Sequence, residues 1–182
     1  MKYNTEWLEE QEKQGKTLNY LFFWGHTVPT DGGIGKTCMS QWYPIGFSEN
    51  GVQYATAEHY MMAQKAILFK DEAILPEILS AKTPNDAKKL GRKVKNFDEA
   101  TWLKHRYEFV KQGNILKFSQ TEVLKGFLLG TGYKIIVEAS PYDKIWGIGL
   151  SQDAPDAQHF STWKGLNLLG FALMEVRDEL LK

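Results

Sequence analysis

The stretch QWYPIGFSENGVQYATAEHYMMAQKA, residues 41–66, decides the fold. Two aromatic-rich runs flank Asn50-Gly51, a pair that favours the tight turn of a β-hairpin. Thr56 then stands where a helix N-cap belongs, so a helix is predicted over residues 57–69. Strands that come first and helices that follow are typical of an α+β fold.

The sequence on either side fits the same pattern. Residues 18–25 and 133–140 read as strands, and residues 4–14 as a short polar helix or a frayed arm. The residue order Thr83, Pro84, Asp86 predicts a helix that ends at Gly91, and Asp98 caps a helix to about residue 117. Other helical segments are predicted at 71–81, interrupted near Pro76, at 120–129 and at 163–181. We expect a single domain over residues 1–182, with residues 1–17 as a peripheral arm.

Composition narrows the functional classes. The 182 residues carry 22 basic and 22 acidic side chains, so no bulk positive field attracts nucleic acid. The single cysteine, Cys38, excludes a disulfide framework and favours a reducing compartment. We expect a cytoplasmic protein, because the polar N-terminal residues do not resemble a secretory signal and no apolar run is long enough to span a membrane.

Familiar catalytic motifs are weak or incomplete. The run GGIGKT, residues 32–37, resembles a phosphate-binding loop, but Thr30 stands where the first glycine of that motif belongs. We interpret residues 30–38 as a loop that lies over a ligand or is simply flexible. The four histidines are scattered without metal-ligand spacing, and His59 is expected to be a buried, satisfied imidazole. Cys38 has no nucleophile motif around it and is expected to be inert.

Two charges stand out on the helix predicted at 57–69. Glu58 and Lys65 are seven residues apart, so they share one face at a separation of about 10 Å along the axis. Burial of charge is costly, which makes their place beside Met61 and Met62 notable. A structural interpretation is also open. The Glu58 carboxylate would interact favourably with the dipole at the helix N-terminus, and the aliphatic part of Lys65 would let its ammonium reach solvent.

Other candidate residues fall elsewhere in the chain. Arg106 interrupts an apolar stripe of its predicted helix, and Trp102 belongs to that stripe. Asp143 and Trp146 follow a predicted strand, close to glycines. Asn167 lies near the start of the last predicted helix. Each has an ordinary structural explanation as a salt bridge, core ring, turn former or helix cap. Together they indicate a pocket with two carboxylates, cations and flat aromatic walls.

Several segments, in order, resemble the YbiA-like or NADAR superfamily. The matching pieces are the hairpin and helix of residues 41–69, TPNDAKKLGR, FDEATWLKHR, GNILKFSQ, IVEASPYDKIWGIGL and WKGLNLLGFALMEVR. The resemblance implies a compact, mainly helical α+β domain around a small β-sheet. It also implies an N-glycosidase that hydrolyses the bond between ribose and a nitrogen heterocycle. One branch of the family acts on phosphoribosylated riboflavin-synthesis intermediates, and another removes ADP-ribose from guanine bases.

The resemblance assigns the site by motif. Glu58, Lys65 and Asp143 become the catalytic residues, and Trp102, Trp146 and Asn167 become substrate contacts, to which we add Arg106. Glu58 would stabilise positive charge on the sugar or activate water. Lys65 would either hold a phosphate or attack the opened sugar as an amine. No metal or cofactor is required.

Alternatives to the riboflavin-pathway substrate remain open. The chain is also compatible with a glycohydrolase for ADP-ribosyl-guanine in nucleotides or nucleic acid, and with a non-catalytic domain that binds ADP-ribose or NAD-related ligands. One local departure from the family bears on this choice. Many relatives carry a short FSN segment before the hairpin, whereas this chain has FFWGHT followed by the glycine-rich residues 30–38.

Overall fold

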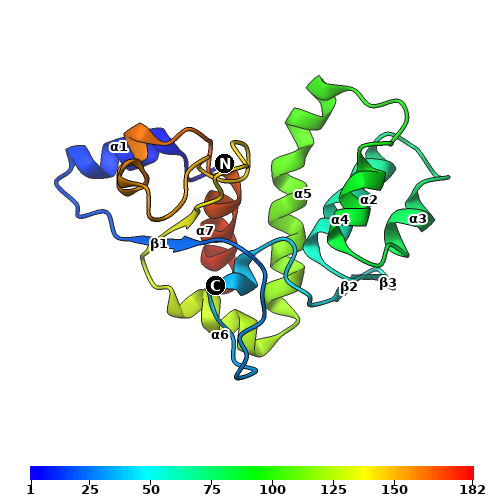
Figure 1. The fold of residues 1–182 in the computed structure, drawn as a ribbon, viewed down its shortest axis with the longest axis horizontal. Helices are drawn as coiled ribbons and strands as arrows, with labels where there is room; N and C mark the ends of the chain where they lie inside the picture. Colours follow the sequence, from blue (N-terminus) through cyan, green and yellow to red (C-terminus); the bar gives the residue numbers. More distant parts are fainter. The chain divides into compact units, whose positions relative to one another are not determined.

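A computed structural model describes all residues, 1–182, and confirms the α+β class with a predominance of helix. The chain folds into two compact units. The terminal unit comprises residues 1–40 and 123–182, and the middle unit comprises residues 41–122. Figure 1 labels helices and strands of both units.

The terminal unit is built on two parallel strands, β1 (Tyr20–Phe23) and β4 (Ile135–Glu138). Tyr20 pairs with Ile135 and Phe23 with Glu138. Helix α7 (Leu168–Leu180) packs on β4 and is buried along most of its length, as expected for a helix that is apolar nearly all round. The other elements of this unit are α1 (Thr5–Lys13), α6 (Glu122–Gly130) and three short 3-10 turns, η1 (Lys36–Met39), η2 (Pro155–Gln158) and η3 (Phe160–Thr162).

The middle unit begins with the predicted hairpin, formed by β2 (Phe47–Glu49) and β3 (Val52–Tyr54). Asn50 and Gly51 both have positive φ, as a tight turn of this kind requires. Helix α2 (Ala57–Leu68) follows and packs against α3 (Leu75–Leu79), α4 (Pro84–Gly91) and α5 (Glu99–Ser119). In Figure 1, α3, α4 and α5 gather around α2, with the long α5 along one side.

The predicted helix caps are confirmed in the middle unit. The side chains of Thr56, Thr83 and Asp98 each accept a hydrogen bond from the backbone N–H three residues later. One detail differs from the predictions. Pro76 lies in the first turn of α3, where its missing N–H costs nothing, rather than interrupting a helix. Gly91 is the last residue of α4, as predicted, and a side chain there would clash, since a Cβ would lie 2.0 Å from Met62 Sδ on α2.

The last helix starts later than its apolar spacing predicts. Asn167 adopts a left-handed conformation with φ of 52° and makes no side-chain cap, so α7 begins at Leu168 rather than near residue 163. Leu166, expected on the apolar stripe, lies before the helix and is 53% exposed. The β-structure also differs in detail from a single small sheet, because each unit has its own pair of strands.

Candidate active site

The candidate residues divide between the two units. Glu58, Lys65, Trp102 and Arg106 belong to the middle unit, on α2 and α5. The other three, Asp143, Trp146 and Asn167, belong to the terminal unit. Within the middle unit the structure brings Lys65 and Trp102 into contact.

Glu58 lies in the first turn of α2 and is buried, with 4% of its surface exposed. Its backbone N–H donates to the carbonyl of Gln41 at 3.0 Å. A carboxylate near a helix N-terminus interacts favourably with the helix dipole, which favours the ionised form. The local structure therefore places the Glu58 carboxyl group where water reaches it poorly.

Lys65 lies half-buried in the last turn of α2 among aromatic rings and a carbonyl. Its Nζ is 4.2 Å from the centroid of the Phe97 ring and 5.6 Å from that of Trp102, and it donates to the carbonyl of Gly91 at 2.8 Å. A cation over ring faces is stabilised by the ring quadrupole. None of these three partners is a carboxylate, so the ammonium is held without a salt bridge.

This environment changes the acidity of Lys65. Burial, and secondarily the positive charge of Arg92, lower the pKa of the Lys65 ammonium from its ordinary value of 10.5. A lowered pKa increases the fraction of neutral amine near physiological pH, and the neutral amine is the nucleophilic form. The side chain is thus suited to amine chemistry as well as to charge pairing.

His59, next to Glu58, has a structural role. Its Nε2 lies 3.0 Å from the carbonyl of Ala81, and its Nδ1 lies 2.8 Å from the hydroxyl of Thr56. Because a carbonyl only accepts, Nε2 carries the proton and Nδ1 accepts from the hydroxyl when the ring is neutral. The imidazole is satisfied on both sides, which confirms the sequence interpretation of a buried His59.

Trp102 and Arg106 lie one turn apart on α5. Trp102 is buried, and its ring centroid is 6.1 Å from that of Phe109 in a tilted arrangement. Arg106 is half-buried. Phe97 is 45% exposed, so its ring is more available for stacking on a heterocycle than the Trp102 ring.

Asp143 shapes the loop after β4. Its Oδ1 accepts from the backbone N–H groups of Ile145 and Trp146, both at 2.8 Å, and its own N–H donates to Ser140 Oγ at 3.2 Å. These bonds form a side-chain-stabilised turn. The carboxylate therefore holds the backbone of the turn up to Trp146. A role for Asp143 in catalysis stays a prediction.

Asn167 is fully buried and its amide is engaged at both ends by β4. Oδ1 accepts from the backbone N–H of Glu138 at 3.0 Å, and Nδ2 donates to the carbonyl of Ile136 at 3.0 Å. The amide therefore pins the start of α7 to the strand. This geometry supports a structural role, and a substrate contact by Asn167 stays a prediction.

Sequence reasoning missed three contributors to the surroundings of Glu58 and Lys65. The Phe97 ring and the Gly91 carbonyl lie 32 and 26 residues from Lys65, so no local periodicity signals them. Gln41 is buried and donates to Asn114 Oδ1 at 3.2 Å, while its own Oε1 accepts no hydrogen bond. The sequence pointed to Gln41 only through its position as the first residue of the segment 41–66.

Three further observations concern the glycine-rich loop, membrane-spanning helices and metal ligands. The glycine-rich residues 30–38 form a turn followed by η1, and Lys36 donates to Gln152 Oε1 at 3.0 Å. No helix has both the length and the apolar character that crossing a bilayer demands. No group of three or more His, Cys, Asp or Glu side chains is arranged to hold a metal ion.

Comparison with known proteins gives consistent matches. The NADAR domain model matches residues 22–181. N-glycosidase R617 of Acanthamoeba polyphaga mimivirus is 44% identical over 90% of this chain and 98% of its own length. The riboflavin biosynthesis protein PYRR, chloroplastic, of Zea mays is 34% identical over 73% of this chain, which corresponds to 21% of that protein. The NMR structure of the E. coli protein YbiA covers 90% of this chain and 85% of its own, with a TM-score of 0.70 and 26% identity.

These matches confirm the enzyme class expected from the sequence, a hydrolase that acts on N-glycosyl compounds. They also confirm the fold expected from the resemblance.

Proposed function

Because the chain belongs to the NADAR family, we propose that it is an N-glycosidase for phosphoribosylated pyrimidine intermediates of riboflavin synthesis. The observation that carries the proposal is the environment of Lys65, an amine of lowered pKa held against Phe97 and Trp102 on the helix that also carries Glu58. The match to a plant protein named for riboflavin biosynthesis supports this substrate class.

Glu58 is proposed to stabilise the sugar as its base departs. Cleavage of a ribosyl C–N bond leaves positive charge on the anomeric carbon and the ring oxygen. A buried carboxylate placed against that charge interacts more strongly with the transition state than with the neutral substrate, which is what lowers a barrier. The burial of Glu58 and its position in the first turn of α2 support this role.

Lys65 is proposed to act as the amine nucleophile. When the C–N bond breaks, its electron pair leaves with the heterocycle, which takes up a proton. The amine forms a bond to the anomeric carbon, and loss of a proton with opening of the sugar ring gives an imine. Water then hydrolyses the imine, releasing the sugar phosphate and the free amine. The lowered pKa favours this role over a permanent phosphate anchor.

The experiment supplies purified protein with a phosphoribosylamino-pyrimidine and, in parallel, with ADP-ribosylated guanine nucleotide. Mass spectrometry detects the released base and sugar phosphate. We expect release from the pyrimidine substrate. Release from the guanine substrate alone would replace the proposed substrate with ADP-ribosyl-guanine. Tight ADP-ribose binding with release from neither would favour a non-catalytic binding domain.

A further inference from the structure

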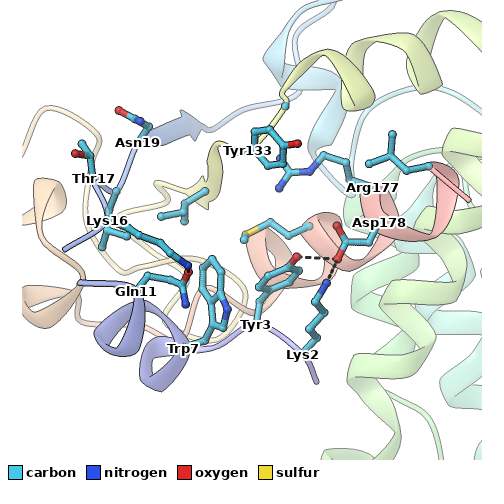
Figure 2. A pocket seen from close by; sticks show the side chains of 15 residues that line it. Lys2, Tyr3, Trp7, Gln11, Lys16, Thr17, Asn19, Tyr133, Arg177 and Asp178 are labelled. Carbon is cyan, nitrogen blue, oxygen red and sulfur yellow. Dashed lines mark hydrogen bonds and ion pairs between the residues drawn. The ribbon is translucent and has the colours of Figure 1, made fainter. Parts of the chain in front are cut away.

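A cavity lies entirely within the terminal unit, and none of the seven candidate active-site residues lines it. Its volume is about 490 Å³, within the range typical of small-molecule sites. The walls come from α1, the segment before β1, the residues around Tyr133 and the last turns of α7. Figure 2 shows the side chains that surround it.

The cavity carries an excess of positive charge. Three cations, Lys2, Lys16 and Arg177, line it together with one acid, Asp178. Lys2 and Asp178 neutralise one another, since their side chains form an ion pair at 2.5 Å. Lys16 and Arg177 form no salt bridge, although Asp178 also attracts the Arg177 charge, so the cavity keeps a net positive charge.

Arg177 is placed to hold an anion. Its side chain is buried, and Nη1 donates to Thr131 Oγ1 and to the carbonyl of Lys134, both at 2.8 Å. These two bonds use both hydrogens of Nη1 and fix the guanidinium plane. The Nε and Nη2 groups donate to no protein acceptor, although Arg177 lines the cavity. A fixed guanidinium with unused N–H groups suits bidentate binding of a phosphate or carboxylate.

Lys16 provides the second charge at a different part of the rim. Its ammonium donates to Gln11 Oε1 at 2.7 Å, and this partner is an uncharged amide. Figure 2 shows Lys16 and Gln11 together, away from Arg177, which lies beside Tyr133. An anion that enters the cavity meets a positive potential from both charges.

Aromatic rings complete the site. Tyr3 and Trp7 are held edge to face, with ring centroids 4.8 Å apart and an interplanar angle of 82°. The Tyr3 hydroxyl donates to Asp178 Oδ2 at 2.7 Å, which fixes this pair against α7. In Figure 2 these rings stand on one side of the cavity and Tyr133 on the other. Rigid rings of this kind favour the flat face of a heterocycle.

We propose that this cavity is a second ligand site, which binds a small molecule that joins a planar ring to a single anionic group, as a nucleoside monophosphate does. The guanidinium of Arg177 holds the anion, and Trp7 contacts the ring. Tyr3, Trp7 and Lys16 precede residues 22–181, which match the family model, so the site depends on residues outside the family's shared segment. The proposal is independent of the N-glycosidase reaction.

The test uses protein labelled with 5-fluorotryptophan and observed by fluorine NMR, with the Trp7 signal assigned from the Trp7→Phe variant. Adenosine 5′-monophosphate is the probe, and adenosine and inorganic phosphate are tested separately. We expect a saturable shift of the Trp7 signal with the monophosphate, and about tenfold weaker binding of either fragment. No saturable shift at millimolar concentrations, or equal binding by one fragment, would overturn the proposal.

Charge variants connect the signal to the cavity. Arg177→Lys keeps the positive charge but loses the planar fork, so we expect about tenfold weaker binding of the monophosphate. Lys16→Gln changes an exposed residue and is expected to weaken binding severalfold without affecting folding. The matched control is Lys13→Gln, a change on α1 outside the cavity, which should leave binding unchanged. Binding unaltered in both Arg177→Lys and Lys16→Gln would contradict the assignment.

Discussion

The position of Lys65 in the fold is unfavourable for stability. Its ammonium is half-buried without a carboxylate partner, and only two ring faces and one carbonyl compensate for lost hydration. A charged group in such surroundings opposes folding more than it supports it. A conflict of this kind between local stability and residue choice is typical of a functional site.

The pH dependence of stability tests this cost. Because the folded-state pKa of Lys65 is lowered below 10.5, the unfolded chain binds more protons at that residue, and the folded state loses stability as pH falls from 10.5 through the lowered pKa. Lys65→Met removes this dependence. The free energy of unfolding, measured in urea, should therefore exceed the wild-type value by most at pH 7 in the Lys65→Met variant. This difference should shrink as pH approaches 10.5. A relative stability that does not change with pH would contradict the burial argument.

The same pKa separates the two roles considered for Lys65. As an amine nucleophile it must be neutral, so kcat should rise with pH and level off above the lowered pKa. As a phosphate anchor it must be charged, so substrate binding should weaken over that pH range. The measurement is the pH profile of kcat and KM for the wild-type protein. The control is the Lys88→Met variant, because Lys88 Nζ also lies over an aromatic ring, 5.7 Å from the centroid of Trp42.

Glu58→Gln tests the catalytic role proposed for Glu58. The amide keeps the shape of the side chain but removes the negative charge, so turnover should fall about 100- to 1000-fold. Circular dichroism and thermal melting check that the fold is intact. The matched control is Glu77→Gln, another first-turn carboxylate of a helix in the same unit, which should retain full turnover. A folded Glu58→Gln variant with wild-type turnover would remove Glu58 from the chemistry.

At the scale of elements, the packing of α2 depends on two glycines of neighbouring helices. A Cβ at Gly113 of α5 would lie 2.7 Å from Cδ1 of Tyr60, and a Cβ at Gly91 would meet Met62. Both contacts place neighbouring helices close to α2, the helix that carries Glu58 and Lys65. Close backbone approach at these positions therefore supports the site indirectly.

A pair of glycine substitutions tests this packing. Gly113→Ala should destabilise the protein by about 1–2 kcal/mol, because the Tyr60 ring must shift in a dense core. Gly126→Ala on α6 meets no atom within 4 Å and should stabilise the protein by up to about 1 kcal/mol through helix propensity. Chemical denaturation measures both. Equal effects of the two substitutions would show that Gly113 is not tightly packed.

Local signals in the sequence were enough for most elements but not for the site. The helix starts and the hairpin turn were predictable because each depends on hydrogen bonds or backbone conformations within a few residues. The residues concerned are the caps Thr56, Thr83 and Asp98 and the turn pair Asn50-Gly51. The start of α7 escaped prediction because the left-handed Asn167 is fixed by β4, about 30 residues away. The contact of Phe97 with Lys65 is similarly non-local, and residue spacing alone does not encode it.

At the scale of the whole molecule, charge balance bears on the substrate. The net charge is zero, so no long-range field favours a nucleic-acid polymer over a free nucleotide. If the chain accepts ADP-ribosylated guanine, kcat/KM for the mononucleotide should equal or exceed that for the same base in DNA at physiological salt. A strong preference for DNA that disappears at high salt would indicate a local basic surface that net charge does not reveal.

Reductive trapping on Lys65 tests the central claim most directly. Wild-type protein is incubated with the phosphoribosylamino-pyrimidine and sodium cyanoborohydride, and its peptides are examined by mass spectrometry. We predict a ribose-phosphate adduct on the peptide that contains Lys65, formed far more slowly in Glu58→Gln and absent from Lys65→Met. The contradicting result has two parts: wild-type protein turns over fully without reductant, and no adduct forms on Lys65 when cyanoborohydride is added.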